Sequence, residues 1–270
     1  MTAPKKKLVV VKIGGNALVN EEALASFIEA VVKLTESGFQ AVVTHGGGPQ
    51  ISQELKSRGI ASEFNAGYRV SSREVVSVVK EVLCVAMQEQ IVSAFSNIGK
   101  KAAGVCGDEG LFQCSKKFLE IDGELIDLQF VGEIDEINIS QVSKLLVEDA
   151  IPVVSSLGCD ADGNLYNINA DAGAAALAAA LSAEILCLLT DVDGVYANYP
   201  DKDSILHSVN EKDLTGLIAK VDTGMIPKLE AAKAALVSGV TKVLIANGNS
   251  GDSLKQSLID NKIVGTMVEK

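Results

Sequence analysis

The sequence predicts an α/β fold, a three-layer sandwich in which helices cover both faces of a mainly parallel sheet. Short β-branched runs alternate along the chain with stretches of helical periodicity, and such alternation is typical of a parallel sheet. The chain has 270 residues, of which 47% are hydrophobic and 22% charged, so it can bury a substantial core. Because neither a Pro/Ser-rich linker nor an internal repeat interrupts it, we expect two lobes that share one continuous sheet.

The first hundred residues predict two strands and three helices. Apolar β-branched runs indicate the strands, and apolar residues at helical spacing indicate the helices. Gly38 marks the end of the first helix, and Pro49 opens the second. Ser71 and Glu74 stand three residues apart, as in a capping box, so we expect Ser71 to cap the third helix. The expected strands are 8–13 and 40–44, and the expected helices are 21–37, 49–58 and 71 to about 98.

The rest of the chain continues the alternation. Asp122 and Gly123 lie between two short extended stretches and predict a hairpin turn. Residues 160–164 resemble the start of a calcium-binding loop, but Leu165 stands where a glycine is required, so we interpret them as a turn. The expected helices are 142–148, 172–181, 229–238 and 254–260, and the expected strands are 151–155, 184–190, 242–246 and an edge strand at 265–268.

The charge balance limits the classes of partner. A formal net charge of −11 and an isoelectric point near 4.7 argue against general nucleic-acid binding, which needs clustered cations. No uninterrupted apolar run approaches the roughly 20 residues of a membrane helix. The apolar run after the basic N-terminus is too short for a signal peptide. We therefore expect a cytoplasmic protein without a nucleic-acid or membrane partner.

Cysteine and histidine usage argues against a disulfide framework and against a metal site. The cysteines are odd in number and widely spaced, and two histidines are few for a zinc site. We interpret each cysteine as a small buried apolar residue. The motifs of P-loop, dinucleotide-binding and protein-kinase folds are also absent from the sequence. The cysteines are Cys84, Cys106, Cys114, Cys159 and Cys187.

Two glycine-rich loops follow the first two strands and are candidate anion sites. A lysine in an apolar strand, such as Lys12, is costly unless its ammonium meets an anion at the strand's end, and glycines 14 and 15 let a ligand approach the backbone. An edge-strand lysine in water is the alternative. Glycines 46–48 precede a helix, so their N–H groups and the helix dipole form an anion cradle. We interpret His45 as a structural residue rather than a general base.

Three later segments add polar groups beside expected helices and strands. Asn167 and Asn169 alternate, so both face one side of an extended segment, and Asp171 either caps the next helix or takes part in the chemistry. Residues 190–196 place carboxylates and a glycine at a strand's carboxyl end. Lys228 lies near a helix N-terminus, where the dipole is already positive. A bound polyanion would explain this placement, although a long lysine can also bend back to solvent.

Six motifs, taken in order, resemble the amino-acid kinase superfamily and, within it, the acetylglutamate kinase family. The resemblance covers essentially the whole chain. It implies ATP-dependent phosphorylation of the side-chain carboxylate of N-acetyl-L-glutamate to N-acetyl-L-glutamyl 5-phosphate, a step of arginine biosynthesis. The motifs are Val-Lys-Ile-Gly-Gly at 11–15, His-Gly-Gly-Gly-Pro at 45–49, Gly-Tyr-Arg-Val at 67–70, Asn-Ile-Asn-Ala-Asp at 167–171, Leu-Thr-Asp-Val-Asp-Gly-Val at 189–195 and Gly-Met-Ile-Pro-Lys at 224–228.

The resemblance also implies a role for each candidate residue. Lys12 and Lys228 would contact the transferring phosphoryl group from opposite sides, and Asp171 would orient them. Residues 1–172 would form the acceptor-binding and dimerisation lobe, and residues 173–270 the ATP-binding lobe. The acceptor would be bound by Gly47, Gly48, Arg69, Asn167 and Asn169. The phosphates and nucleotide would be bound by Gly14, Gly15, Asp191, Val192, Asp193, Gly194, Val195, Tyr196, Lys220, Val221 and Asp222.

ATP with Mg²⁺ is the implied cosubstrate, without a dedicated protein metal site. Arginine-inhibited relatives carry an additional N-terminal helix, whereas only about six residues precede the first strand here, so we expect an arginine-insensitive homodimer. Tyr68 stands where leucine is common in the family. The alternatives are a related carboxylate kinase, such as one acting on carrier-bound aminoadipate in lysine synthesis, and a non-catalytic metabolite sensor. A nitrogen-signalling protein partner stays open.

Overall fold

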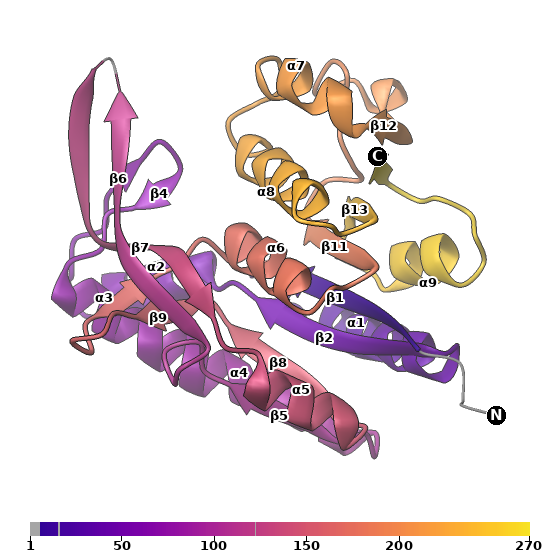
Figure 1. Ribbon diagram of the computed structural model, residues 1–270, viewed down its shortest axis with the longest axis horizontal. Coiled ribbons are helices and arrows are strands. Elements are labelled where there is room, and N and C mark those ends of the chain that lie inside the picture. The colour runs from indigo at the N-terminus through magenta and orange to yellow at the C-terminus, as the bar shows by residue number, and fades with distance from the viewer. Residues whose placement is uncertain (1–5, 16, 122) are drawn as a thin grey trace.

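A central sheet organises the molecule. The computed structural model describes residues 6–15, 17–121 and 123–270. The strands of the main sheet are β1 (Lys7–Ile13), β2 (Phe39–His45), β5 (Ala102–Val105), β8 (Ile151–Ser155), β11 (Ile185–Thr190), β12 (Ser208–Asn210), β13 (Lys242–Asn247) and β14 (Thr266–Glu269). Their order is β12-β14-β13-β11-β1-β2-β8-β5 (Figure 1). The six strands from β13 to β5 are parallel, and β14 runs antiparallel to β13.

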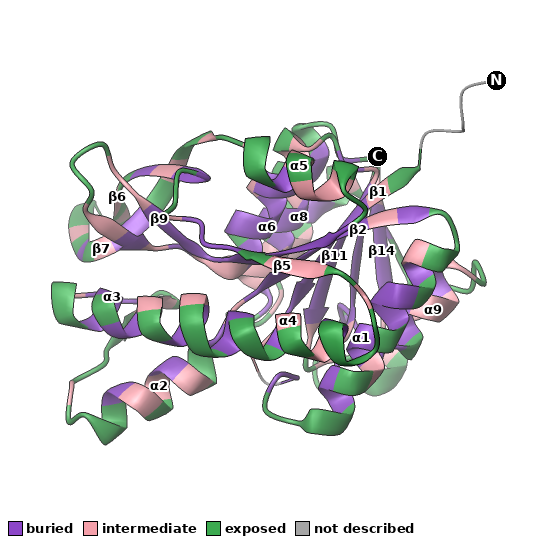
Figure 2. Cartoon of the chain, turned by 90° about the horizontal axis from the view of Figure 1, so that it is seen from below, coloured by how far each residue is buried: buried purple, intermediate pink, exposed green. Residues whose placement is uncertain are grey.

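Helices cover both faces of this sheet and form the outer layers of the predicted sandwich. The helices are α1 (Glu21–Glu36), α2 (Gly48–Ser57), α3 (Arg73–Lys80), the π-helical η1 (Glu81–Met87), α4 (Gln88–Asn97), α5 (Ser140–Val147), α6 (Ala170–Ala180), the 3₁₀ turns η2 (Lys202–Ser204) and η3 (Glu211–Asp213), α7 (Leu214–Ile218), α8 (Ile226–Val237) and α9 (Asp252–Leu258). Figure 2 shows α1, α4 and α9 on one face, and α5, α6 and α8 on the other. Of the helices described, none is both long and apolar enough to cross a membrane.

The core lies on both sides of the sheet, because side chains of a strand alternate between its faces. Val9 and Val11 of β1 pack into the apolar cluster beneath α1 and α4. Val10 points the other way, into the cluster beneath α6 and α8. All three valines are fully buried, as expected for a strand covered on both faces. This explains why residues 8–11 are continuously apolar rather than alternating.

A long hairpin projects from the main sheet beside the small hairpin β3 (Phe64–Asn65) and β4 (Tyr68–Arg69) (Figure 1). Its strands are β6 (Phe112–Ile121) and β7 (Glu124–Ile137), joined at their base by β9 (Leu157–Cys159) and β10 (Leu165–Asn167). The pairing reaches Ile121 and Glu124, which confirms the predicted hairpin. Asp122 lies outside the described residues, and Gly123 has φ of +83°, a conformation that favours glycine.

Two boundary predictions were wrong. Ser72, not Ser71, caps α3, since its Oγ accepts from the N–H of Val75 at 3.2 Å. Ser71 is instead buried and extended, and its backbone pairs with β7. The last strand, β14, is not at the edge, because β12 adds beyond it. A three-residue strand such as β12 is too short to carry a recognisable alternation.

The other predicted helices and strands were confirmed to within a few residues. The long helix runs continuously through α3, η1 and α4, but its middle is π-helical, which the apolar spacing did not indicate. The segment after Asp160 is a turn, as predicted, because its carboxylate accepts from the N–H groups of Asp162 and Asn164.

Candidate active site

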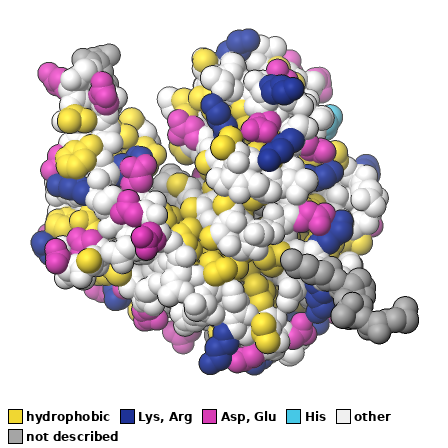
Figure 3. All heavy atoms as spheres, viewed as in Figure 1, with side chains coloured by type: hydrophobic (Ala, Val, Ile, Leu, Met, Phe, Trp, Pro, Cys, Tyr) yellow, Lys and Arg dark blue, Asp and Glu magenta, His cyan; other side chains and the backbone are white. Residues whose placement is uncertain are grey.

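Three cavities open at the carboxyl ends of the parallel strands, where an open α/β sheet binds its ligands. They follow the hollow between the projecting hairpin and the α7–α8 part of the molecule (Figure 3). The N-terminal cavity, of about 230 Å³, lies over β2 and α6. The C-terminal cavity, of about 660 Å³, lies beside β11 and α8. The central cavity, of about 180 Å³, shares Lys12 with the N-terminal cavity and Lys228 with the C-terminal one.

Lys12, Asp171 and Lys228 converge at this junction. Lys12 Nζ lies 2.9 Å from one oxygen of the Asp171 carboxylate, and Lys228 Nζ lies 3.2 Å from the other. Their side chains are only 8%, 7% and 15% exposed, in sequence order. Lys12 leaves the end of β1, whereas Asp171 and Lys228 stand in the first turns of α6 and α8. The fold therefore joins two lysines that are remote in sequence through one carboxylate.

The electrostatics of this triad favour an anionic ligand. Burial acts to raise the pKa of Asp171, but the charges and hydrogen bonds of Lys12 and Lys228 outweigh it and hold the pKa below its usual value. Asp171 is therefore ionised, and one positive charge remains among the three groups. The N-termini of α6 and α8 add their dipoles at the same place. A bound phosphate would thus meet positive potential from four sources.

Arg69 is held rigidly in the N-terminal cavity. Its guanidinium donates to the Gly48 carbonyl oxygen at 3.0 Å, to Ser52 Oγ at 2.8 Å and to Ser62 Oγ. It also lies 4.5 Å from the centre of the Phe64 ring. Burial lowers the pKa of Arg69 from its ordinary, very high value, and the group stays charged. A fixed guanidinium of this kind suits a planar carboxylate.

Two glycines of the glycine-rich loops, Gly15 and Gly47, lie where a Cβ would crowd neighbouring side chains. A Cβ on Gly47 would lie 2.5 Å from Met87 Sδ and 2.6 Å from a methyl carbon of Leu83, both of which belong to η1. A Cβ on Gly15 would meet the Pro49 ring at 2.9 Å. Gly48 has open space around it. Glycines 15 and 46–48 all line the N-terminal cavity, where the anion-cradle interpretation puts such a loop.

The two asparagines of the third motif both line the N-terminal cavity but have different partners. Asn169 caps α6, since its Oδ1 accepts from the N–H groups of Asp171 and Ala172. Asp171 is therefore in the first turn and is not the cap. Asn167 Nδ2 donates to Ser71 Oγ at 3.2 Å, and that hydroxyl donates to the Arg69 carbonyl oxygen at 2.8 Å. Ser71 thus supports two candidate residues, a role that its position in the sequence did not reveal.

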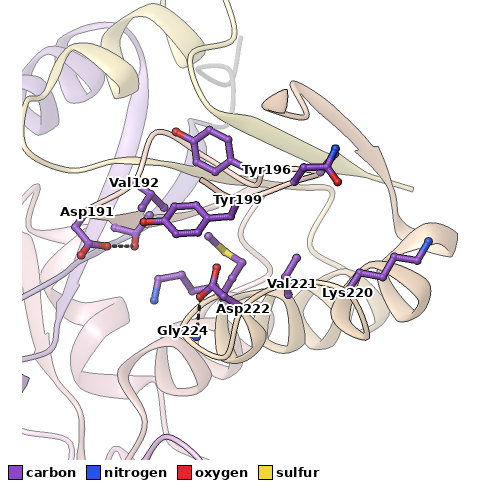
Figure 4. A pocket seen from close by; sticks show the side chains of 13 residues that line it. Asp191, Val192, Tyr196, Tyr199, Lys220, Val221, Asp222 and Gly224 are labelled. Atoms are coloured by element: carbon purple, nitrogen blue, oxygen red, sulfur yellow. Dashed lines mark hydrogen bonds between the residues drawn. The ribbon is translucent and has the colours of Figure 1, made fainter. Parts of the chain in front are cut away.

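The C-terminal cavity contains most of the residues predicted to bind a nucleotide (Figure 4). The rings of Tyr196 and Tyr199 stand 5.9 Å apart beside it. Figure 4 shows Lys220 extending away from Asp191 and Asp222. The predicted residues on its wall are Asp191, Val192, Tyr196, Lys220, Val221 and Asp222. The wall residues that the prediction missed are Thr190, Ala197, Asn198, Tyr199, Gly224 and Met225.

Asp193, Gly194 and Val195 do not line this cavity. The Asp193 carboxylate accepts from the Tyr196 hydroxyl at 3.2 Å and from an asparagine of β13 at 2.8 Å. The Val195 N–H donates to Thr266 Oγ1 at 2.8 Å, and a Cβ on Gly194 would lie 2.7 Å from that oxygen. These residues fix the loop from behind and hold Tyr196 in place.

His45 has the structural character that the sequence indicated. It is fully buried, and burial lowers its pKa to about 4, so the imidazole is neutral near pH 7. Its Nδ1 lies 3.4 Å from the Gly46 carbonyl oxygen, and among the described residues Nε2 has no hydrogen-bond partner. The side chain lines none of the three cavities.

Comparison with known proteins shows the family to which the chain belongs. Residues 7–247 match the profile of the amino acid kinase family. The chain is 42% identical to acetylglutamate kinase of Streptomyces avermitilis, over 99% of this chain and 89% of that protein. It is 43% identical to acetylglutamate kinase of Corynebacterium diphtheriae, over 98% of this chain and 86% of the relative. N-acetylglutamate synthase of Neisseria gonorrhoeae, solved with coenzyme A and N-acetyl-glutamate, shares the fold with a TM-score of 0.85 and 22% identity, over 98% of this chain and 59% of that one. The chain is therefore a kinase that belongs to the amino acid kinase family, among the acetylglutamate kinases.

Proposed function

We propose that this protein transfers the terminal phosphoryl group of ATP to the side-chain carboxylate of N-acetyl-L-glutamate. The product is N-acetyl-L-glutamyl 5-phosphate, an intermediate of arginine biosynthesis. The observation that carries the proposal is the Lys12–Asp171–Lys228 triad at the junction of three cavities. Relatives at about 42% identity over nearly the whole chain, named acetylglutamate kinases, support the choice of acceptor.

The chemistry needs charge neutralisation more than proton transfer. An acceptor carboxylate with a pKa near 4.3 is already ionised at neutral pH, so no general base is required. The barrier is the repulsion between this carboxylate and the phosphates, followed by a loose, anionic transition state. Lys12 approaches from the acceptor side and Lys228 from the nucleotide side, and both neutralise the group in transit. Asp171 holds the two ammonium groups in position.

The N-terminal cavity accounts for recognition of a small dicarboxylate. Arg69 binds the acceptor's α-carboxylate through the charge of its guanidinium and through the N–H groups that Gly48, Ser52 and Ser62 leave free. The N–H groups of Gly47 and Gly48 bind the reacting carboxylate. Asn167 contacts the acetamido group, and Asn169 contributes to the same wall. The volume of about 230 Å³ suits such an acceptor, whereas the C-terminal cavity of about 660 Å³ suits a nucleotide.

Mg²⁺ accompanies ATP in this proposal. Mg²⁺ is commonly bound through substrate phosphates and water with few protein ligands. Asp171 is a poor ligand for a further cation, because each of its oxygens already faces a lysine ammonium. The chain therefore suits a metal ion that is bound to the phosphates of ATP and adds positive charge beside them. Gly14 and Gly15 let these phosphates approach β1.

The two lobes divide the work in this proposal. Residues 1–172 bind the acceptor and make the dimer, and residues 173–270 bind ATP through the loop 191–196 and the segment 220–222. The enzyme is proposed to be a cytoplasmic homodimer. Light scattering coupled to gel filtration measures the mass of the particle, and a mass of one chain would refute the dimer.

An acceptor panel tests the function. The protein is incubated with ATP, Mg²⁺ and hydroxylamine, which converts an acyl phosphate to a hydroxamate that can be measured. N-acetylglutamate should give product at a kcat/KM far above glutamate, aspartate and carbamate. Equal rates with free glutamate would refute the assigned acceptor, and product from carrier-bound aminoadipate alone would support the lysine-synthesis alternative. Binding of N-acetylglutamate without turnover would support a sensor.

A further inference from the structure

A cluster of thiols and one carboxylate lies behind the N-terminal cavity, outside the three cavities described above. Cys84 belongs to η1, Cys106 follows β5 directly, and Asp108 stands two residues later. Their two sulfurs and one carboxylate oxygen all lie within 4.8 Å of one another. Cys84 Sγ is 3.9 Å from Asp108 Oδ1. The mechanism proposed above uses none of these groups.

We propose that Cys84, Cys106 and Asp108 form a binding site for a thiophilic divalent cation such as Zn²⁺. Zinc binds thiolate sulfur at about 2.3 Å and carboxylate oxygen at about 2.0–2.2 Å, in a tetrahedron. Sulfur and oxygen ligands of such a tetrahedron lie roughly 3.5 Å apart, given these bond lengths. The 3.9 Å between Cys84 Sγ and Asp108 Oδ1 needs only a small rotation of side chains to reach that value.

The surroundings of Asp108 favour a metal ligand. The Asp108 side chain is only 4% exposed, and Lys80 Nζ binds its Oδ2 at 2.7 Å. This leaves Oδ1 directed toward the thiols. An outer partner that holds a ligating carboxylate is a common feature of metal sites. The formal charges of the occupied site also cancel. Two thiolates and one carboxylate carry three negative charges, and the Lys80 ammonium and a divalent cation carry three positive ones.

Two further groups complete the site. Gln88 is buried, and its Nε2 donates to the Val153 carbonyl oxygen at 3.0 Å. Its Oε1 lies 3.9 Å from Cys106 Sγ, so this amide oxygen or a water molecule provides the fourth ligand. Ser155 Oγ lies 3.1 Å from Cys84 Sγ and can donate to the thiolate once the metal displaces the proton. A cation can enter beside Lys80, whose side chain is 43% exposed.

The role of the metal in this proposal is structural, because it stabilises the wall of the N-terminal cavity. Leu83, which precedes Cys84, and Ser156, which follows Ser155, both line that cavity. A metal at Cys84 would therefore fix η1, against which Gly47 packs. The sequence analysis argued against a metal site, because the ligands at 84, 106 and 108 form no recognisable motif.

Cobalt titration tests the proposal without reference to kinase activity. The full-length protein is reduced with a phosphine, freed of metal with a chelator, transferred to chelator-free buffer and titrated with Co²⁺. We expect one Co²⁺ per chain, with the visible bands of a tetrahedral ion and a thiolate-to-cobalt charge-transfer band. Zn²⁺ should displace Co²⁺ and abolish the bands. Titration of the free thiols beforehand should find five per chain, which establishes that Cys84 and Cys106 are both reduced.

Matched variants locate the site. Cys84→Ser and Cys106→Ser should each lose the charge-transfer band or weaken binding at least tenfold, and Lys80→Met should weaken it roughly 10- to 100-fold. Cys114→Ala, which removes a buried thiol elsewhere, should bind like the wild type. Circular dichroism checks that each variant is folded. Absence of a thiolate band in the fully reduced wild type would overturn the proposal, as would bands that survive in both cysteine variants.

Discussion

Replacing Asp171 with asparagine tests the electrostatic reasoning directly. The change keeps the shape of the side chain but removes the charge that both lysines face at 2.9 and 3.2 Å. Removing one partner of a buried ion pair typically costs about 3–5 kcal/mol, because the other charge is left uncompensated. Lys228 keeps 15% of its side chain exposed and can turn toward solvent. We therefore expect a loss near the lower end, about 3 kcal/mol.

A thermal melt of the free protein measures this loss. Each kcal/mol shifts the midpoint by about 2–4 °C in a domain of 150–250 residues, so Asp171→Asn should melt roughly 6–12 °C below the wild type. Nucleotide should reverse much of the effect, because its phosphates supply the missing anion between the lysines. At equal nucleotide concentration, the midpoint should rise more in the variant than in the wild type.

Asp149→Asn is the control, since it removes a carboxylate from an exposed pair with Lys6, with Asp149 83% exposed. Such surface pairs contribute little to stability, so its melt should match the wild type. The reasoning is refuted if Asp171→Asn melts together with Asp149→Asn. It is also refuted if nucleotide raises the midpoint of Asp171→Asn no more than that of the wild type.

Three more outcomes follow from the site. Lys12→Ala and Lys228→Ala should each lower kcat by roughly a hundredfold or more, as for other lost electrostatic donors; near-normal turnover in both would defeat the mechanism. Arg69→Lys should chiefly raise the KM for the acceptor, because an ammonium cannot both keep the protein partners of the guanidinium and donate to the acceptor. An unchanged KM would remove Arg69 from the site. Burial lowers the pKa of His45 to about 4, so the imidazole is neutral in the folded protein near pH 7. Its contribution to the free energy of unfolding is therefore complete above about pH 6.5 and declines as the pH falls toward 4. The decline is at most about 1.4 kcal/mol per pH unit. Urea unfolding across this range should show a steeper decline in the wild type than in His45→Gln.

The sequence predicted the elements best where burial alone decides them. The strand at residues 8–13 was located because a strand buried on both faces is apolar along most of its length, with Lys12 near its end as the exception. The helix 21–37 was located because a surface helix carries one apolar stripe. The cap of α3 was misplaced because Ser71 and Ser72 are equally good capping residues. Only the tertiary pairing of Ser71 with β7 decides between them.

The candidate site was predictable in its parts but not in its geometry. Parallel strands end at one edge, so Lys12 and the glycine loops had to meet there. The packing reason for Gly47 lies in the π-helical η1, which no local sequence pattern indicates. Asp193 and Val195 were assigned to the nucleotide because they belong to a motif, whereas their partners are on β13 and β14 and come from later in the chain.

The position of Lys228 is unfavourable within its own helix, but other parts of the folded chain compensate for it. A lysine in the first turn of α8 opposes the helix dipole, and near it Lys12 adds a second cation, which is buried. Asp171, at the N-terminus of α6, offsets both charges and is itself favoured by its own helix dipole. This balance keeps the free protein stable while leaving one net positive charge. The phosphate therefore binds to groups that folding has already positioned. The free energy of positioning them does not add to the barrier of the reaction.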